Sequence, residues 1–251
     1  MKNQNIFVGV TFTLTLLLGE GLAFAHMRDY LVNQSYHTTR KGEFELELHN
    51  DLNLKEGDND NTYSSQHQVE FEYGLTNRLQ LAYYEVLKWD RPNDWQRDSF
   101  KIETKYRFLE SGELPVDVAL YGEYRNPNGH QDTGSDVVEG KLILSKDFGP
   151  WNVTGNLVAE REIDAHEDWQ WEYTAGVSYS LSPKVRLGLE LKEDLGDQGE
   201  FGIHRKAHKL QLVPGIYANV APHVRLLFGP AIGLSHAADD LQLKSIVEIE
   251  F

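Results

Sequence analysis

An alternation of apolar and charged residues with a period of two runs through most of the chain, and it constrains the fold more than any other feature. In its first stretch, Phe44, Leu46 and Leu48 alternate with Glu45 and Glu47. Alternation of this kind is typical of a β-strand with one apolar and one polar face. The pattern recurs often enough to predict twelve strands, close in length to the roughly 9 to 11 residues that cross a bilayer when tilted. The expected strands cover residues 42–54, 62–73, 78–89, 99–108, 116–125, 137–147, 151–163, 169–180, 185–192, 207–219, 223–235 and 241–251.

The connections between these strands alternate in length. Mostly tight turns with Gly, Pro, Asn or Ser cover residues 73–78, 109–115, 147–150, 181–184 and 220–223. Generally longer polar loops cover residues 55–61, 90–97, 126–135, 164–168, 194–205 and 236–240. Outer-membrane barrels have short periplasmic turns, longer external loops and an even number of strands. We therefore expect an all-β fold: a transmembrane antiparallel up-and-down β-barrel of about 12 strands, with the N- and C-termini periplasmic.

The charged side chains lie almost entirely on one face of the expected strands. By parity, 17 acidic and 12 basic side chains share that face, and only Glu85, Lys146 and Arg161 lie on the other. A soluble β-sandwich would hide its apolar face and expose charge on every strand, and parity alone does not decide which face looks outward. The export signal, the lack of a stretch able to supply a helical plug core and the aromatic residues near the strand ends favour lipid contact for the apolar face; a secreted soluble barrel is the alternative. Aromatic residues near the strand ends fit two interfacial girdles. They are Tyr63, Trp89, Tyr124, Trp169 and Trp171 toward the loops, and Tyr73, Phe108, Trp151, Tyr179 and Phe251 toward the turns.

The N-terminus has the features of an export signal. Lys2 precedes an apolar run over residues 6–18, and Ala23-Phe24-Ala25 is a small-x-small cleavage site. The expected organisation is a signal peptide over residues 1–25, an N-terminal periplasmic tail or lumen plug over residues 26–41, and a transmembrane barrel over residues 42–251. A retained anchor helix is the alternative for the first segment.

The last expected strand carries Leu241, Leu243, Val247 and Ile249 and ends on Phe251. With the export signal and the amphipathic strands, this ending resembles Gram-negative outer-membrane β-barrels, in which a C-terminal aromatic residue is the assembly signal. The resemblance implies a location in the cell outer membrane, surrounded by its lipid, and recognition of Phe251 by the barrel assembly machinery. Residues 72–79 and 181–188 are also similar to turn-strand units of transporter-like barrels associated with aromatic-compound degradation.

Composition excludes several function classes. The chain has no cysteine, which removes disulfide scaffolds, thiolate zinc sites and thiol catalysis. Its formal net charge of -15 argues against nucleic acid as a partner. No cofactor is expected.

The lumen is the candidate functional site. Twelve strands enclose a space between the filled interior of eight-stranded barrels and the wide channel of porins with sixteen or more. An acidic wall facing basic ones would give a transverse field that orients dipolar or zwitterionic solutes. The pore-lining residues expected from parity are Glu43, Glu45, Glu47, Glu70, Glu72, Arg78, Lys101, Lys105, Arg107, Arg186, Arg225, Glu248 and Glu250.

The expected function is a passive outer-membrane channel, similar to a porin, for small polar or charged solutes. The acidic surplus predicts mild cation selectivity. One alternative is a structural or surface-interaction barrel, its lumen filled by ion pairs, whose acidic external loops contact a partner or cations. A second alternative is an outer-membrane lipid hydrolase.

No catalytic or metal-binding residues are predicted. Barrel phospholipases carry a Ser and a His on the outer face, and Ser65 with His67 is the nearest analogue, but the sequence reveals no polar partner to orient His67. Histidines in four expected loops lie near aspartates and invite a metal hypothesis, but no pair has the spacing of a preformed site. They are His130, His166, His204 and His236.

Three residues are expected to disturb the ladder. Pro214 and Pro230 fall within strands and each lacks a backbone donor, which predicts bulges or shifted strand boundaries. Glu85 breaks the parity of its strand and is expected near the external rim or beside a bulge.

Overall fold

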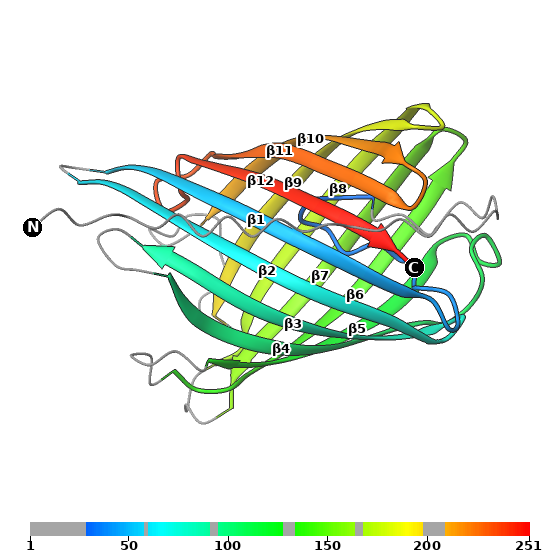
Figure 1. Cartoon of the computed structure of the whole chain (residues 1–251), viewed down its shortest axis with the longest axis horizontal. Helices are drawn as coiled ribbons and strands as arrows, with labels where there is room; N and C mark the ends of the chain where they lie inside the picture. Colours follow the sequence, from blue (N-terminus) through cyan, green and yellow to red (C-terminus); the bar gives the residue numbers. More distant parts are fainter. Residues whose placement is uncertain (1–28, 58–59, 91–94, 128–133, 164–167, 198–208) are drawn as a thin grey trace, which may run out of the picture.

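The chain folds into a closed barrel of twelve antiparallel strands in which each strand pairs with its neighbours in sequence and β1 pairs with β12 (Figure 1). This computed structural model describes residues 29–57, 60–90, 95–127, 134–163, 168–197 and 209–251. In that part of the chain, no helix is long and apolar enough to cross a membrane. The strands are β1 (Phe44–Gly57), β2 (Asp60–Thr76), β3 (Leu79–Asp90), β4 (Trp95–Arg107), β5 (Asp117–Pro127), β6 (Val137–Phe148), β7 (Trp151–Glu162), β8 (Gln170–Ser182), β9 (Val185–Asp197), β10 (Leu210–Ala221), β11 (Val224–Gly233) and β12 (Leu241–Glu250).

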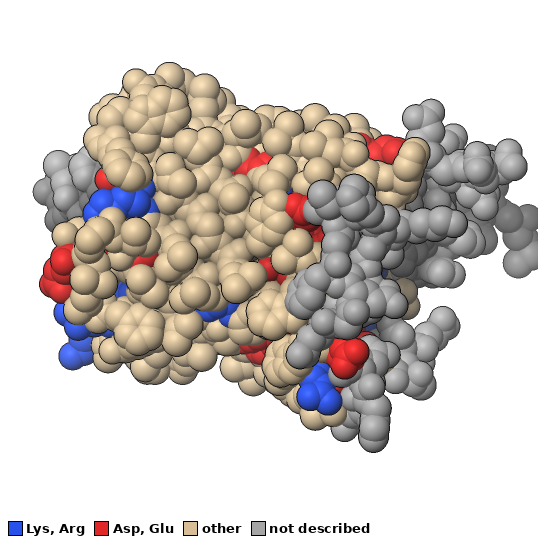
Figure 2. Space-filling view, turned by 180° about the vertical axis from the view of Figure 1, so that it is seen from behind, with Lys and Arg blue, Asp and Glu red and all other residues tan. Residues whose placement is uncertain are grey.

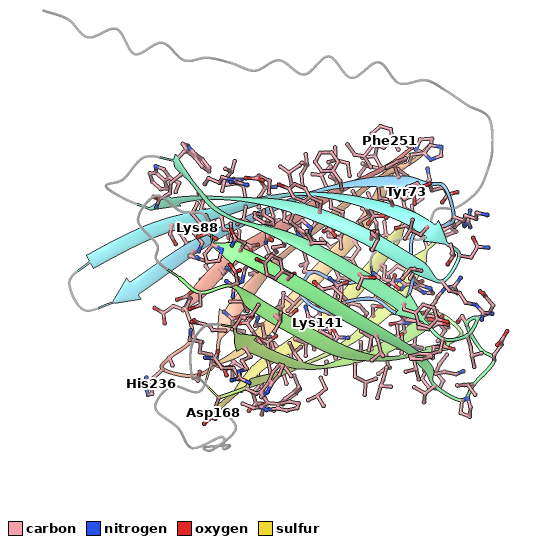
Figure 3. The ribbon with its side chains drawn as sticks, turned by 90° about the horizontal axis from the view of Figure 1, so that it is seen from below. Tyr73, Lys88, Lys141, Asp168, His236 and Phe251 are labelled. Atoms are coloured by element: carbon pink, nitrogen blue, oxygen red, sulfur yellow. The ribbon has the colours of Figure 1, made fainter. Side chains whose placement is uncertain are left out.

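The two ends of the barrel differ. At the end that we call the turn end, short connections join β2 to β3, β6 to β7, β8 to β9 and β10 to β11, and β1 begins where β12 finishes. The opposite end, the loop end, carries the remaining connections except the one between β4 and β5. Figure 3 shows Tyr73 and Phe251 at the turn end, and Lys88, Asp168 and His236 at the loop end.

The outer wall is apolar because the alternate residues that point away from the lumen are mostly apolar. Phe44, Phe71, Ile102 and Phe228 are at least half exposed, which is an arrangement suited to lipid. Figure 2 shows few charged atoms over the middle of one face, with charged side chains gathered toward its ends. Aromatic pairs surround the turn end, with ring centroids 4.5 Å apart for Phe44 and Tyr73 and 4.6 Å apart for Trp151 and Tyr179.

The expected strands all overlap observed ones, but β9 runs five residues beyond its expected end at Lys192. This extension adds Glu193 to the outward-facing charged residues, because Glu193 pairs with Tyr173 on the outward face. The side chain is 5% exposed. The sequence count of outward charges was therefore too low near the loop end.

Glu85 lies beside an irregularity, as expected. The register between β3 and β4 shifts between Val86 and Leu87, directly after Glu85. Arg97 donates hydrogen bonds to both carboxylate oxygens of Glu85, and Tyr83 donates a third of 2.7 Å. Arg97 belongs to β4 and not to the preceding loop, so this outward-facing carboxylate has a cationic partner on the adjacent strand.

The prediction that the prolines cause bulges or shifted boundaries was wrong. Pro214 pairs regularly with Leu189 of β9, and Pro230 with Leu243 of β12. Between β10 and β11 the ladder stops after Leu212–Ile232 and resumes at Ile216–Phe228 in the same register. Both prolines lie in this gap. Because each lacks a backbone N–H donor, the hydrogen bonds between β10 and β11 are interrupted there, but the register of the two strands does not change.

Residues 29–39 lie inside the barrel, and Arg40 and Lys41 are exposed at its turn end. After them the chain turns at Gly42, whose φ of 85° suits glycine, and the Gly42 amide donates to the Gly74 carbonyl. Most side chains of the segment are buried, and part of it is visible as a dark blue trace within the barrel in Figure 1. We call residues 29–41 the inner segment. The expected signal peptide and residues 26–28 lie outside the described residues.

The close approach of the inner segment and β10 to Gly229 predicts a cost for any side chain there. A Cβ at this position would overlap the Pro214 carbonyl oxygen and lie 2.8 Å from Leu31 Cδ1. We expect Gly229→Ala to lower the free energy of unfolding by about 1–3 kcal/mol, because overpacked backbone must shift. Urea unfolding of the refolded barrel in detergent measures this. Gly122→Ala is the control, since the nearest atom to its Cβ is 3.8 Å away; equal stability of the two variants would contradict the prediction.

Candidate functional site

The carboxylate of Glu190 on β9 fixes the inner segment in the lumen. Its Oε1 accepts the backbone N–H of Leu31 at 2.7 Å, and its Oε2 accepts those of Val32 and Asn33 at 2.8 Å each. Tyr217 on β10 donates its hydroxyl to the same carboxylate at 2.9 Å. Because Glu190 is 1% exposed, these charge-assisted bonds replace the hydration that burial removes.

Further contacts hold the inner segment along its length. Asp29 pairs with Arg186 at 2.5 Å, and the backbone N–H of Gln34 donates to Asn156 Oδ1 at 2.7 Å. Farther along, the Thr39 hydroxyl donates to Glu72 Oε2 at 2.8 Å. The segment therefore contacts strands on several sides of the barrel.

Apolar contacts add to these hydrogen bonds. Leu31 packs in a buried cluster with Val213 and Leu227, and Tyr36 packs in another with Ala119 and Ile143. The inner segment thus contributes to the small apolar core of the lumen.

His37 on the inner segment stays neutral at pH 7. Burial, followed by the nearby positive charges of Lys105 and Arg107, lowers the pKa of its ring to about 3. A neutral ring avoids adding a third cation beside these two residues.

A cavity of about 610 Å³ occupies the lumen between the inner segment and the loop end. Leu31, Val32 and Gln34 form its floor, and Lys141, which lines it, lies between the two ends of the barrel in Figure 3. Seven carboxylate and five ammonium side chains line it. These are Asp51, Glu123, Glu139, Glu160, Glu172, Asp194 and Asp239, with Lys101, Lys141, Lys192, Lys209 and Lys244.

The charges around the cavity are arranged in neighbouring pairs. Nitrogen–oxygen distances are 3.2 Å for Lys101–Glu123, 2.9 Å for Lys141–Glu139, 2.7 Å for Lys192–Glu172 and 2.6 Å for Lys244–Asp51. These pairs belong to strands around the whole barrel. The cavity wall therefore alternates in sign along its circumference and is not divided into one acidic and one basic side.

The space beside and below the inner segment is smaller. A pocket of about 20 Å³ lies between the segment and the wall formed by Glu45, Glu47, Glu72, Gln80 and Lys105. A separate recess of about 510 Å³ opens near the turn between β8 and β9. The inner segment thus lies between the large cavity and the turn end.

An acidic wall lies next to the inner segment where the barrel closes. Glu45 is opposite Glu250 and Glu72 in the ladders of β1, and Glu47 is opposite Glu248 and Glu70. Two rows of three glutamates therefore cross β12, β1 and β2, as parity predicted for these strands. Most of these side chains are buried: Glu45, Glu47, Glu70, Glu72 and Glu248 are each at most 5% exposed.

The thirteen residues expected to line a pore separate into distinct places. Lys101 lines the large cavity, while Glu45, Glu47, Glu72 and Lys105 face the 20 Å³ pocket. The others occupy the acidic wall, the turn-end recess or the contacts of the inner segment and turns. Glu70, Glu248 and Glu250 belong to the acidic wall, and Arg186 and Arg225 line the turn-end recess. The last three make contacts elsewhere: Arg107 with Thr38, Arg78 with Glu110, and Glu43 with Arg40 at 4.0 Å.

Sequence reasoning missed Glu190 and most of the cavity lining. Parity placed Glu190 on the lumen face together with the other charged residues. No feature of the sequence indicated that its carboxylate would accept hydrogen bonds from the backbone of residues 31–33. The lining residues Asp51, Glu139, Lys141 and Lys244 share the parity of the expected pore residues. Applying the same parity to the loop-side half of each strand would have identified these lining residues.

His67 on the outer face has an orienting partner that the sequence did not reveal. Its Nδ1 lies 2.7 Å from Asn50 Oδ1 on β1. Register places the two residues directly opposite each other. Within the described part of the chain, however, Ser65 makes no hydrogen bond to His67, and the contact between nucleophile and base that ester hydrolysis requires is not formed.

The metal hypothesis for the loop histidines can be examined only at His236. His130, His166 and His204 lie outside the described residues. His236 is described and exposed, and no metal-ligating group that the described residues form includes it.

Similarity to known proteins is confined to the fold. No model of a known protein family matches the sequence, and no curated protein matches it. An outer-membrane channel from Pseudomonas putida F1 aligns with a TM-score of 0.67 at 13% identity, over 86% of this chain and 98% of the other. The KdgM porin aligns with a TM-score of 0.55 at 9% identity, over 82% and 98%. The chain therefore has the fold of outer-membrane β-barrels.

Loss of the Glu190 carboxylate should release the inner segment. The chain lacks cysteine, so Ser35→Cys, at a buried position of the segment, gives a single reporter for a water-soluble maleimide. We expect Glu190→Ala to raise its labelling rate at least about tenfold, the equivalent of about 1.4 kcal/mol, because three amides lose their acceptor. Glu160→Ala is the control, since Glu160 pairs with Arg125 instead. Equal labelling in Glu190→Ala and Glu160→Ala would show that other contacts hold the segment.

Proposed function

We propose that this chain is a passive outer-membrane channel for small polar or charged solutes, and that the inner segment plugs it. The observation that carries the proposal is the cavity of about 610 Å³ with a charged lining. A barrel with only a structural role would fill its lumen with packed side chains. Small-molecule sites typically occupy about 300–1,000 Å³, so the cavity has a size suited to such a solute.

The fold comparisons support this function in general terms. One of the similar structures is described as an outer-membrane channel, and another as a porin. The KdgM porin has also been solved in complex with disordered oligogalacturonate, with a TM-score of 0.56. We take the membrane location and the channel function from this likeness, but not the solute.

The orientation follows from the same class of proteins. Outer-membrane barrels place their short turns in the periplasm, so we assign the turn end and both strand termini to that side. The cavity then opens toward the exterior, and the inner segment enters from the periplasm. Phe251, at the end of β12, is the residue we expect the assembly machinery to recognise. A signal peptide cleaved after Ala25 would export the chain.

The plug predicts a specific change in conductance. Deleting residues 29–39 should raise the single-channel conductance in planar bilayers, because the segment lies between the cavity and the turn end. Replacing the same residues with a Gly/Ser sequence of equal length should raise it as well, since the replacement lacks the Asp29 ion pair with Arg186 and the buried side chains of Leu31 and Tyr36.

Two outcomes would count against this function. Unchanged conductance after the deletion would remove the plug. An absence of discrete current steps in both the full chain and the deleted one would instead favour the closed, structural barrel.

The cavity also predicts ion preference. Carboxylates outnumber ammonium groups in its lining, so we expect mild cation selectivity that weakens as salt rises, because exposed charges are screened beyond about 10 Å at 0.1 M. Lys244→Met, which frees Asp51, should increase the selectivity, and Asp51→Asn should decrease it. Reversal potentials in a salt gradient measure both. Lys146→Met, which removes a lysine whose ammonium contacts the Leu114 carbonyl outside the lumen, should leave them unchanged; anion preference in the full chain would contradict the prediction.

A further inference from the structure

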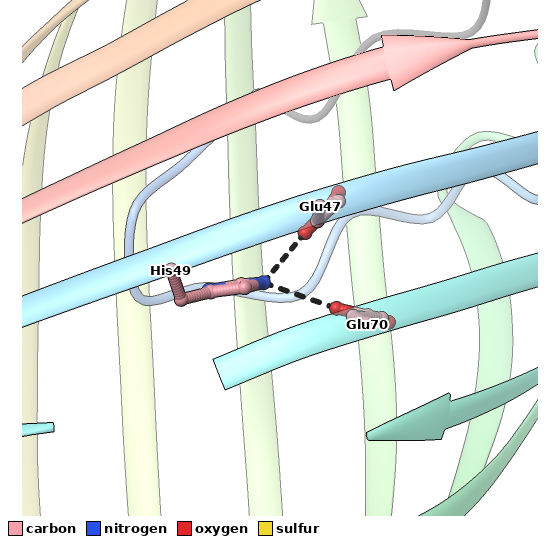
Figure 4. A group of neighbouring side chains, drawn as sticks. All are labelled: Glu47, His49 and Glu70. Carbon is pink, nitrogen blue, oxygen red and sulfur yellow. Dashed lines mark hydrogen bonds and ion pairs between the residues drawn. The ribbon is translucent and has the colours of Figure 1, made fainter. Parts of the chain in front are cut away.

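His49 on β1 directs one ring nitrogen between two buried carboxylates. Its Nε2 lies 2.8 Å from Glu47 Oε2 and 3.0 Å from Glu70 Oε2 (Figure 4). The carboxylate side chains are 2% and 0% exposed, and that of His49 is 12% exposed. Glu47 lies two residues before His49 on the same strand, and Glu70 lies opposite Glu47 on β2.

These three residues bring one donor atom each within 4.8 Å of one another, close enough to share one metal ion. Imidazole nitrogen and carboxylate oxygen lie about 2.0–2.2 Å from a bound transition metal, so two donors at right angles are about 3 Å apart. Both distances from Nε2 have this value. One histidine with two carboxylates is a ligand set for borderline divalent ions such as Co²⁺ or Zn²⁺, whereas Ca²⁺ and Mg²⁺ prefer oxygen alone.

Unsatisfied oxygens next to the group provide a second, independent observation. Glu70 also belongs to a group with Glu72 and Glu103, whose donor oxygens lie within 4.8 Å of one another. Glu103 is 1% exposed, and its Oε1 has no hydrogen-bond partner among the described residues. The same is true of Oε1 of Glu45, which is 5% exposed. Buried carboxylate oxygens without partners are costly, and a bound cation offsets that cost.

The side chains of this wall do not supply enough positive charge. Five glutamates of the acidic wall are buried, as is the neighbouring Glu103 of β4, and among the described residues the comparably buried cations of the barrel are Lys105 and Arg225. The glutamates are Glu45, Glu47, Glu70, Glu72, Glu103 and Glu248. Protonation of His49 would add a single charge.

A cation can reach the group from the large cavity. His49 lines the cavity of about 610 Å³, whereas Glu47 lines the 20 Å³ pocket beside the inner segment. The group therefore lies at the boundary between the two spaces. A site with three protein ligands and a face toward an aqueous cavity leaves positions for water.

We propose that Glu47, His49 and Glu70 form a binding site for one borderline divalent metal ion at the inner edge of the cavity. This site goes beyond the channel function, because metal binding at equilibrium does not depend on whether solutes pass. The competing interpretation is that a protonated His49 forms ion pairs with the two glutamates and binds no metal.

The test is metal binding to the full chain, refolded in detergent and stripped of metal with EDTA. Titration with Co²⁺, followed by its visible absorption, reports ligand type, and calorimetry with Zn²⁺ reports stoichiometry. We expect one ion per barrel to bind more tightly than any ions bound by the loop histidines. His49→Ala and Glu70→Gln should each weaken this binding at least tenfold. His67→Ala is the matched control, because His67 is on β2 and its ring contacts Asn50 outside the lumen.

Several results would overturn the proposal. These are equal Co²⁺ binding by the full chain and His49→Ala, loss of binding in His67→Ala, or a preference for Ca²⁺ or Mg²⁺ over Zn²⁺. Because substitution in a buried group can prevent folding, each variant is first checked for the circular dichroism of a folded barrel. His49→Gln, which keeps a polar side chain of similar size, is used if His49→Ala does not fold. Conductance of the same preparations is recorded separately, so that failure of the channel function is distinguishable from failure of metal binding.

Discussion

Closure of the sheet between β1 and β12 is the constraint on which the rest of this structure depends. Hydrocarbon offers no hydrogen-bond partners, so a strand with an unpaired edge could not remain in a bilayer. The closing ladder runs without a register shift from Glu45–Glu250 to Leu54–Leu241. It also determines the chemistry of the interior, because it brings glutamates from opposite ends of the sequence onto one wall. That wall exists only in the closed barrel.

The sequence predicted the strands and their two faces because both depend on local geometry. Successive side chains of a strand point to opposite sides, so parity alone identified the lumen face. The register shift beside Glu85 was also predictable, since a charge on the apolar face needs either a charged partner or a position near the water at the rim. The effect of Pro214 and Pro230 was not, because it depends on the two residues being opposite each other across β10 and β11, which only the register reveals.

The interior was harder to predict for a different reason. The inner segment has no sustained period, and its position depends on contacts with residues more than a hundred positions away, such as Glu190. Parity also cannot distinguish a carboxylate that accepts backbone amides from one that pairs with lysine. Glu190 and Glu172 have the same orientation, yet one contacts the inner segment and the other contacts Lys192. Such differences arise from where the segment lies in the lumen.

The place of the inner segment has a consequence for the order of assembly. It precedes β1 in the chain, yet its contacts with Asn156, Glu190 and Tyr217 hold it within a wall completed only when β12 joins β1. While the sheet is still open, the segment can reach β7 and β9 from the side. Once the sheet has closed, the segment would have to thread in through one end of the barrel. A barrel that closes around its own N-terminal segment avoids that threading step, because the inner segment is then in place before β12 pairs with β1.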